Sequence, residues 1–215
     1  DDGRILGAQG VGREGIDKRI DVIATAVRGD LRATDLIDLD LSYAPPFGAA
    51  KDPVMMLGMI ADNVLSGRLT QHDPVVPLDP EATLVLDVRN PDEWDRGHVE
   101  GALLVPQPEV AASIDAIRDA AAGRPIVVHC ASGFRSYLAN RTLAGAGIDS
   151  ANVSGGFTTL ALAQPHLIAH AQTSPASATT SGTTVSSTNA GRNANPSGST
   201  MVTPSLAAAS SNCSS

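Results

Sequence analysis

Short apolar segments alternate with helical segments through the middle of this chain of 215 residues. The expected strands are 83–88, 102–105, 125–129 and 151–153, and the expected helices are 91–95, 109–121, 134–146 and a segment after Gly155-Gly156. A short strand that is apolar throughout is buried on both sides, which is typical of a parallel sheet between two layers of helices. The alternation therefore predicts an α/β domain at residues 83–165, with helices on both faces of a parallel sheet.

The first 70 residues have a different pattern. A strand-like segment at 3–8 is followed by amphipathic helical patterns at 17–28 and 52–69. A single strand has no neighbour to pair with, so we interpret residues 1–70 as part of a truncated α+β domain. Residues 10–15 have the glycine spacing of a dinucleotide-binding loop, but no second strand follows the helix to complete such a unit. We therefore expect no cofactor in this chain.

Two further segments differ from the rest in composition. Residues 71–82 contain Pro74, Pro77 and Pro80, which predicts a stiff linker. Residues 172–215 are almost entirely Ser, Thr, Ala, Asn, Gly and Pro, with Arg192 as their one charge. Such a segment buries too little apolar surface to offset the entropy of ordering, so we expect a disordered tail.

The charge of the chain limits its partners. Fifteen Lys and Arg residues against 23 Asp and Glu give a net charge of −8, and only Lys18 and Lys51 are lysines. This composition offers no basic face for nucleic acid. No apolar run reaches the roughly 18 residues of a membrane helix, so we expect no membrane partner either. The two cysteines do not resemble a disulfide framework, which favours a cytoplasmic location, and we predict no metal site.

Cys130 stands where an expected strand ends and an expected helix begins, the place where open α/β sheets bind ligands. The predicted active-site loop consists of Cys130 and the residues after it: Ala131, Ser132, Gly133, Phe134, Arg135 and Ser136. Loop N–H groups, the helix N-terminus and the nearby Arg135 all lower the pKa of a cysteine and favour its thiolate. The alternative is a buried, inert cysteine at a strand end. We favour the thiolate because a glycine, an arginine and the start of a helix occur together in this loop.

Four motifs in this part of the chain follow one another as they do in rhodanese domains. They are Asp87-Val88-Arg89 with Glu93-Trp94, Gly97-His98-Val99-Glu100-Gly101-Ala102, the loop 130–136, and Ser154-Gly155-Gly156-Phe157. Residues 83–165 therefore resemble a rhodanese domain. In that family the loop cysteine takes up a sulfane sulfur as a persulfide and passes it to an acceptor such as a thiol or cyanide.

The resemblance implies that Cys130 carries the sulfur and that the backbone amides of residues 131–135 hold the persulfide. It also implies that Arg135 attracts small anionic sulfur donors such as thiosulfate. Related folds that hydrolyse phosphate esters have one residue more between the cysteine and the arginine, which makes phosphatase or arsenate reductase chemistry the less favoured alternative. The family pattern further implies that Asp87 and Arg89 form an ion pair that braces the loop. His98 would be a structural histidine and Trp94 a core residue.

The N-terminal part carries a second resemblance. The residues concerned are Gly3-Arg4-Ile5-Leu6-Gly7-Ala8-Gln9, Asp17-Lys18-Arg19-Ile20-Asp21, and Tyr43-Ala44-Pro45-Pro46-Phe47 with Lys51-Asp52-Pro53. They resemble the C-terminal dimerisation domain of coenzyme A-disulfide and NADH-dependent persulfide reductases, some of which carry a fused rhodanese domain.

This second resemblance implies FAD and NAD(P)H for the full-length relative, which is a homodimer. Tyr43 would reach the coenzyme A site of the partner subunit. Two hypotheses follow for the chain. It is either a sulfurtransferase that uses small sulfur donors and thiol acceptors, or the C-terminal part of a flavoprotein reductase that cannot act as a reductase on its own.

Overall fold

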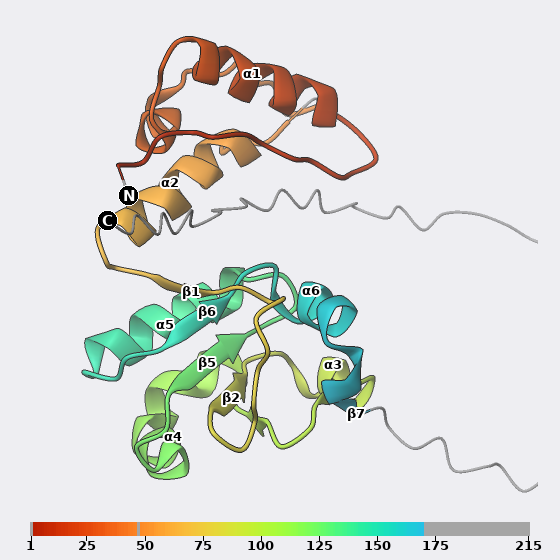
Figure 1. Ribbon diagram of the computed structural model, residues 1–215. Coiled ribbons are helices and arrows are strands. Elements are labelled where there is room, and N and C mark those ends of the chain that lie inside the picture. The colour runs from red at the N-terminus through yellow and green to blue at the C-terminus, as the bar shows by residue number, and fades with distance from the viewer. Residues whose placement is uncertain (1, 47, 170–215) are drawn as a thin grey trace, which may run out of the picture.

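A computed structural model describes residues 2–46 and 48–169 of the chain (Figure 1). The predicted disordered tail at 172–215 lies outside the described residues. No helix in the described part of the chain has both the length and the apolar character needed to cross a membrane.

A parallel sheet of five strands forms the centre of the larger part of the molecule. The strand order is β1 (Thr70–His72), β6 (Ala151–Val153), β5 (Ile126–His129), β2 (Leu84–Asp87) and β4 (Leu103–Leu104). Each neighbouring pair is parallel, and Leu84–Asp87 pairs in register with Ile126–His129. The sheet confirms the α/β prediction.

The two faces of the sheet hold separate apolar cores, as the alternation of side chains along a strand requires. Leu84 and Leu86 of β2 face one core, and Val85 between them faces the other. Helices α4 (Ile114–Ala121) and α5 (Phe134–Gly145) cover the first face, and α6 (Gly156–Ala163) covers the second (Figure 1). The remaining elements are α3 (Pro91–Asp95) and the 3₁₀ helices η2 (Gln107–Ser113) and η3 (Pro165–Leu167).

Three secondary-structure elements of the sheet domain differ from the sequence-based expectations. Residues 71 and 72, expected in a linker, lie in strand β1 and pair with β6. A two-stranded antiparallel ribbon of β3 (His98–Val99) and β7 (Ile168–Ala169) was not expected at all. The helix expected at 109–121 is instead η2 followed by α4, because Pro106 and Pro108 constrain the backbone at its start.

The N-terminal part packs around α1 (Ile16–Arg28), η1 (Ala33–Asp38) and α2 (Pro53–Leu65). Its buried core consists of Ile23, Ala26, Leu36 and Val54. Residues 3–8, expected as a strand, form only one isolated bridge, from Arg4 to Arg32. That expectation was wrong because, among the described residues, no neighbouring strand supplies the hydrogen bonds that a ladder needs.

The N-terminal part contacts the sheet domain through α2 and α5. The Asn63 side-chain amide donates to the Tyr137 hydroxyl at 3.4 Å. The Arg141 guanidinium donates to the Arg68 carbonyl just after α2. The same helix that begins at the Cys130 loop therefore also contacts the N-terminal part.

Gln164, which is 4% exposed, fastens the segment between β1 and β2 to the domain. Its side-chain carbonyl accepts from the Leu78 N–H at 3.0 Å, and its amide nitrogen donates to the Pro74 and Val76 carbonyls at 2.8 Å. The proline-rich segment is thus bound along the domain instead of spanning a gap as a linker. The sequence does not reveal this because the contacts join residues far apart in the chain.

We predict that Gln164→Ala lowers the free energy of unfolding by about 2–4 kcal/mol, because it leaves two buried backbone groups and one part-buried carbonyl without this partner. Urea unfolding followed by circular dichroism measures the change. The matched control is Leu162→Ala on the preceding helix, where the side chain is 81% exposed. That control should change stability by less than about 0.5 kcal/mol. Equal effects of the two substitutions would contradict the role given to Gln164.

Candidate active site

Cys130 follows the last residue of β5, at the carboxyl edge of the sheet, and its side chain is nearly fully buried at 1% exposure. The chain then turns through Ala131 and Ser132 to Gly133, which caps α5 with φ of 112°. Such a φ strongly favours glycine. The predicted loop and the predicted start of the helix are therefore present as expected.

The sulfur of Cys130 accepts hydrogen bonds from inside the loop. The Gly133 N–H donates to Sγ at 3.2 Å. The Ser136 hydroxyl lies 3.4 Å from Sγ and 3.0 Å from the Gly133 carbonyl, so it can donate to either. Burial alone would raise the pKa of Cys130, but these donors and the N–H groups of Ser132 and Ser136 outweigh burial and lower it below the usual value. The arrangement favours the thiolate.

The first turn of α6 donates hydrogen bonds to the backbone of the loop. The Phe157 N–H donates to the Cys130 carbonyl at 2.7 Å. The Thr158 N–H and hydroxyl both donate to the Ala131 carbonyl, at 3.2 and 3.0 Å. Gly156 permits this approach: a Cβ built on it would lie 2.6 Å from the Cys130 carbonyl oxygen and 2.7 Å from the Ser132 nitrogen. This bracing was not predicted, although the glycine motif itself was.

Arg135 makes a bidentate ion pair with Glu93 of α3. The two guanidinium nitrogens lie 2.7 and 2.8 Å from the two carboxylate oxygens. Glu93 is itself fixed by the Asn90 N–H, which donates to it at 3.0 Å. The hydrogen bonds from Arg135, more than any other cause, lower the pKa of Glu93 to about 2, so the carboxylate is ionised at any ordinary pH. This pair was not predicted from the sequence, because its members are 42 residues apart.

A second ion pair is fully enclosed beside the loop. Arg89 binds both carboxylate oxygens of Asp87, with a shortest distance of 2.6 Å, and the two side chains are 4% and 0% exposed. The guanidinium also donates to the carbonyls of Gly97 and Glu93 and lies 3.8 Å from the centre of the Phe157 ring. The structure thus places Asp87 and Arg89 between β2, α3 and the first turn of α6.

Two histidines near these elements do not contact the Cys130 sulfur through any hydrogen bond among the described residues. The His98 ring stacks on Trp94 with centroids 3.8 Å apart, and its Nδ1 lies 3.2 Å from the Trp94 carbonyl. Trp94 is half-buried instead of being enclosed in the core. His129 is fully buried, and burial lowers its pKa, so that it is neutral at pH 7.

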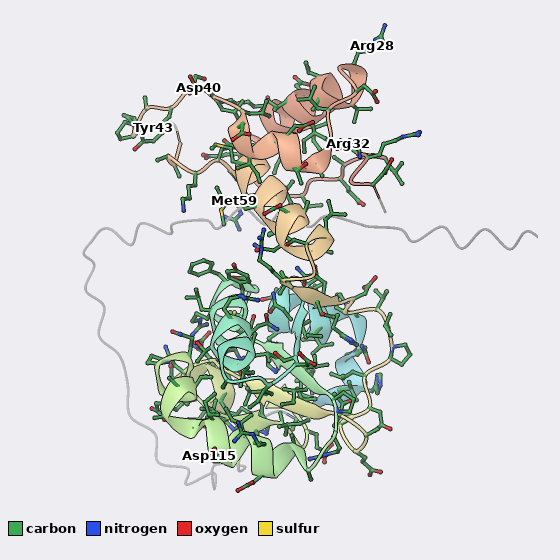
Figure 2. All side chains as sticks on the ribbon, turned by 90° about the vertical axis from the view of Figure 1, so that its left-hand side faces the viewer. Arg28, Arg32, Asp40, Tyr43, Met59 and Asp115 are labelled. Atoms are coloured by element: carbon green, nitrogen blue, oxygen red, sulfur yellow. The ribbon has the colours of Figure 1, made fainter. Side chains whose placement is uncertain are left out.

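Tyr43 lies apart from this site. It is 53% exposed, and Figure 2 shows it on the N-terminal part, well away from the sheet that carries Cys130. Residues 10–15 precede α1 as an irregular segment, and no parallel strand flanks them within the described ranges. Within those ranges, no group of three metal-ligating side chains gathers.

Comparisons with known proteins show what the chain is similar to. Residues 75–162 match the family model of the rhodanese-like domain. The structure of reduced Bacillus anthracis CoADR-RHD superposes with a TM-score of 0.65 and 36% identity, covering 74% of this chain and 28% of that one. An NAD-dependent persulfide reductase from A. fulgidus gives a TM-score of 0.60 and 35% identity, covering 69% and 26%.

A curated coenzyme A disulfide reductase of Staphylococcus aureus is 44% identical over 55 residues, which are 26% of this chain and 13% of that protein. The chain therefore spans only a small part of the length of these relatives. The family model covers residues 75–162, which are less than half of the chain. The alignment with the Bacillus anthracis structure covers 74% of the chain, so it includes residues outside 75–162. The resemblance to a rhodanese domain and the similarity to coenzyme A-disulfide and persulfide reductases are thereby confirmed, whereas the assignment of residues 1–70 to a dimerisation domain stays a prediction.

We predict that Gly156→Ala displaces the loop and raises the pKa of Cys130, because the new Cβ would overlap the Cys130 carbonyl and the Ser132 nitrogen. The pH dependence of Cys130 alkylation by iodoacetamide measures this pKa in a Cys213→Ser background. Gly147→Ala is the matched control, because Gly147 has a φ of +72° but open space around it. The control should cost about 1–2 kcal/mol of backbone strain and leave the pKa unchanged. Identical alkylation profiles for the two variants would refute the bracing role of Gly156.

We also predict that Ser136→Ala raises the pKa of Cys130, because the thiolate loses a hydroxyl donor. The alkylation profile should move to higher pH, so the rate at neutral pH should fall. Thr142→Ala is the control on the same helix, since the Thr142 hydroxyl donates to the Leu138 carbonyl. An unchanged profile for Ser136→Ala would mean that its hydroxyl donates only to the Gly133 carbonyl.

Proposed function

We propose that this chain, in which residues 75–162 form a rhodanese-like domain, is a sulfurtransferase that carries sulfane sulfur as a persulfide on Cys130. The observation that supports this most directly is the Cys130 sulfur, which lies among inward-pointing donors at the start of α5 with its pKa lowered. The proposal includes small sulfur donors, and thiols or cyanide as acceptors.

In the loading step, the Cys130 thiolate attacks the outer sulfur of a donor such as thiosulfate. A new S–S bond forms to Sγ, the S–S bond of thiosulfate breaks, and its electron pair leaves with sulfite. The persulfide that remains carries one negative charge, as the thiolate did. Loop N–H groups that stabilise the thiolate suit this anion as well, since fixed backbone dipoles need no reorganisation during the reaction.

In the transfer step, a thiolate or cyanide attacks the outer sulfur of the persulfide. The Cys130 thiolate leaves with the electron pair, and the product is a new persulfide or thiocyanate. Because the Cys130 side chain is only 1% exposed, the outer sulfur of the persulfide is the atom that an acceptor would reach. The Cys130 thiolate is consumed in the loading step and released in the transfer step, so the cysteine must not be held in a disulfide, which suits the reducing cytoplasm that we propose as the location.

A second candidate function is supported by the structural matches to the reductases. We propose that the chain corresponds to the C-terminal part of an FAD- and NAD(P)H-dependent coenzyme A-disulfide or persulfide reductase, with the rhodanese-like domain as its sulfur-handling part. The FAD and NAD(P)H, the homodimer and the coenzyme A site near Tyr43 belong to this proposal for the longer protein. On this view the described residues do not act as a reductase by themselves.

We predict that Cys130→Ala abolishes sulfur transfer while the fold is retained, because the loop backbone remains but the nucleophile is lost. Thiocyanate formation from thiosulfate and cyanide measures turnover, and mass spectrometry of the loaded protein detects the added sulfur. Cys213→Ser is the matched control and should keep both signals. Comparable turnover by Cys130→Ala and the unaltered chain would overturn the proposed function.

A further inference from the structure

The positive charge expected to attract anionic donors is already paired in this structure. Arg135 was expected to bind donors such as thiosulfate, yet both of its terminal nitrogens contact the Glu93 carboxylate. A bidentate contact of this kind uses the same fork that would bind an anionic ligand. The pair is partly enclosed, with the two side chains 31% and 19% exposed, so it is screened less than a fully exposed pair.

The other guanidinium beside the loop is paired as well. Arg89 is held by Asp87 at 2.6 Å and is 4% exposed. Neither arginine therefore brings an uncompensated positive charge to the loop. The thiolate adds one negative charge, and the formal charge of −8 on the whole chain has the same sign. The loop N–H groups can stabilise one negative charge at the reacting sulfur, but neither arginine has a charge left to offset a second negative charge on a donor.

From this arrangement we infer that Glu93 is a specificity-determining residue: by neutralising Arg135, it makes the Cys130 site favour sulfur donors with a single negative charge over dianions. Small organic persulfides and thiosulfonates carry one negative charge, whereas thiosulfate carries two. The inference rests on the proposed sulfur transfer and names the charge class of the donor. Glu93 acts through Arg135 and not on the reacting sulfur.

The experiment compares two donors that deliver the same outer sulfur but differ by one charge, thiosulfate and methanethiosulfonate. Glu93→Gln removes the carboxylate charge and keeps a similar shape. Coulomb energy scales with ligand charge, so the KM should fall about tenfold for thiosulfate and about threefold for methanethiosulfonate. Asp92→Asn is the matched control, because Asp92 is the neighbouring residue and pairs with Arg96 in the solvent at 3.0 Å. This control should leave the ratio of the two KM values unchanged.

Ionic strength gives a second test, and its first arm uses the unaltered chain. Added salt weakens attraction and repulsion alike. In the unaltered chain, the KM for thiosulfate should stay constant or fall with salt, because no free cation attracts the dianion. In Glu93→Gln it should rise with salt, because Arg135 is then free.

Different outcomes would contradict the proposed sulfur transfer and the proposed role of Glu93. If the unaltered chain loads sulfur from neither donor, the proposed function fails. If it uses both donors but its KM for thiosulfate rises steeply with salt, Arg135 is free in solution and the inference is overturned. Equal KM changes for the two donors in Glu93→Gln, or a loss of kcat without a change in the KM ratio, would show that Glu93 only braces the loop.

Discussion

Hydrogen bonds from the first turn of α6 to the carbonyls of Cys130 and Ala131 determine the shape of the loop on which the site depends. With these carbonyls held outward, the N–H groups of the following residues point inward, and that of Gly133 reaches the sulfur. The contact is possible because β5 and β6 are neighbours in the sheet. The strand order thus places the turn before α5, which carries Cys130, beside the turn before α6, whose first residues donate hydrogen bonds to it.

The short helix α3 contacts both arginines beside this loop through Glu93. Asn90 and Glu93 form reciprocal hydrogen bonds at its start, which fix the Glu93 carboxylate. That carboxylate pairs with Arg135, while the Glu93 carbonyl accepts from Arg89. One residue therefore connects both arginines to the same helix. Because each guanidinium already has a carboxylate partner, the anionic sulfur is stabilised mainly by the Ser136 hydroxyl and backbone N–H donors, and the paired Arg135 adds a weaker attraction.

The parts predicted well from sequence are those with a strong local signal. Apolar runs identified β2 and β5, and the step from strand to helix identified the Cys130 loop. The parts that were missed depend on distant contacts. Thr70–His72 is a polar edge strand without an apolar pattern, and Ile168–Ala169 is a strand only because His98–Val99 lies beside it. Likewise, the pairing of Glu93 with Arg135 is visible only once α3 is placed next to the loop. The segment 3–8 was wrongly expected as a strand because an apolar pattern does not show whether a partner exists.

An anion that is stabilised by backbone N–H groups requires a particular backbone conformation, whereas an anion that is stabilised by a charged side chain does not. Gly133, Gly155 and Gly156 have φ values of +112°, +74° and +62°, a region that other residues adopt only with strain. Gly156 in addition leaves no room for a Cβ against the loop. The donors are consequently part of a rigid turn, positioned before any donor molecule arrives, and they cannot follow a ligand as a lysine could. For the proposed sulfur transfer, donors in fixed positions suit the single outer sulfur of a persulfide, and the four residues between Cys130 and Arg135 are one fewer than in the related folds that hydrolyse phosphate esters.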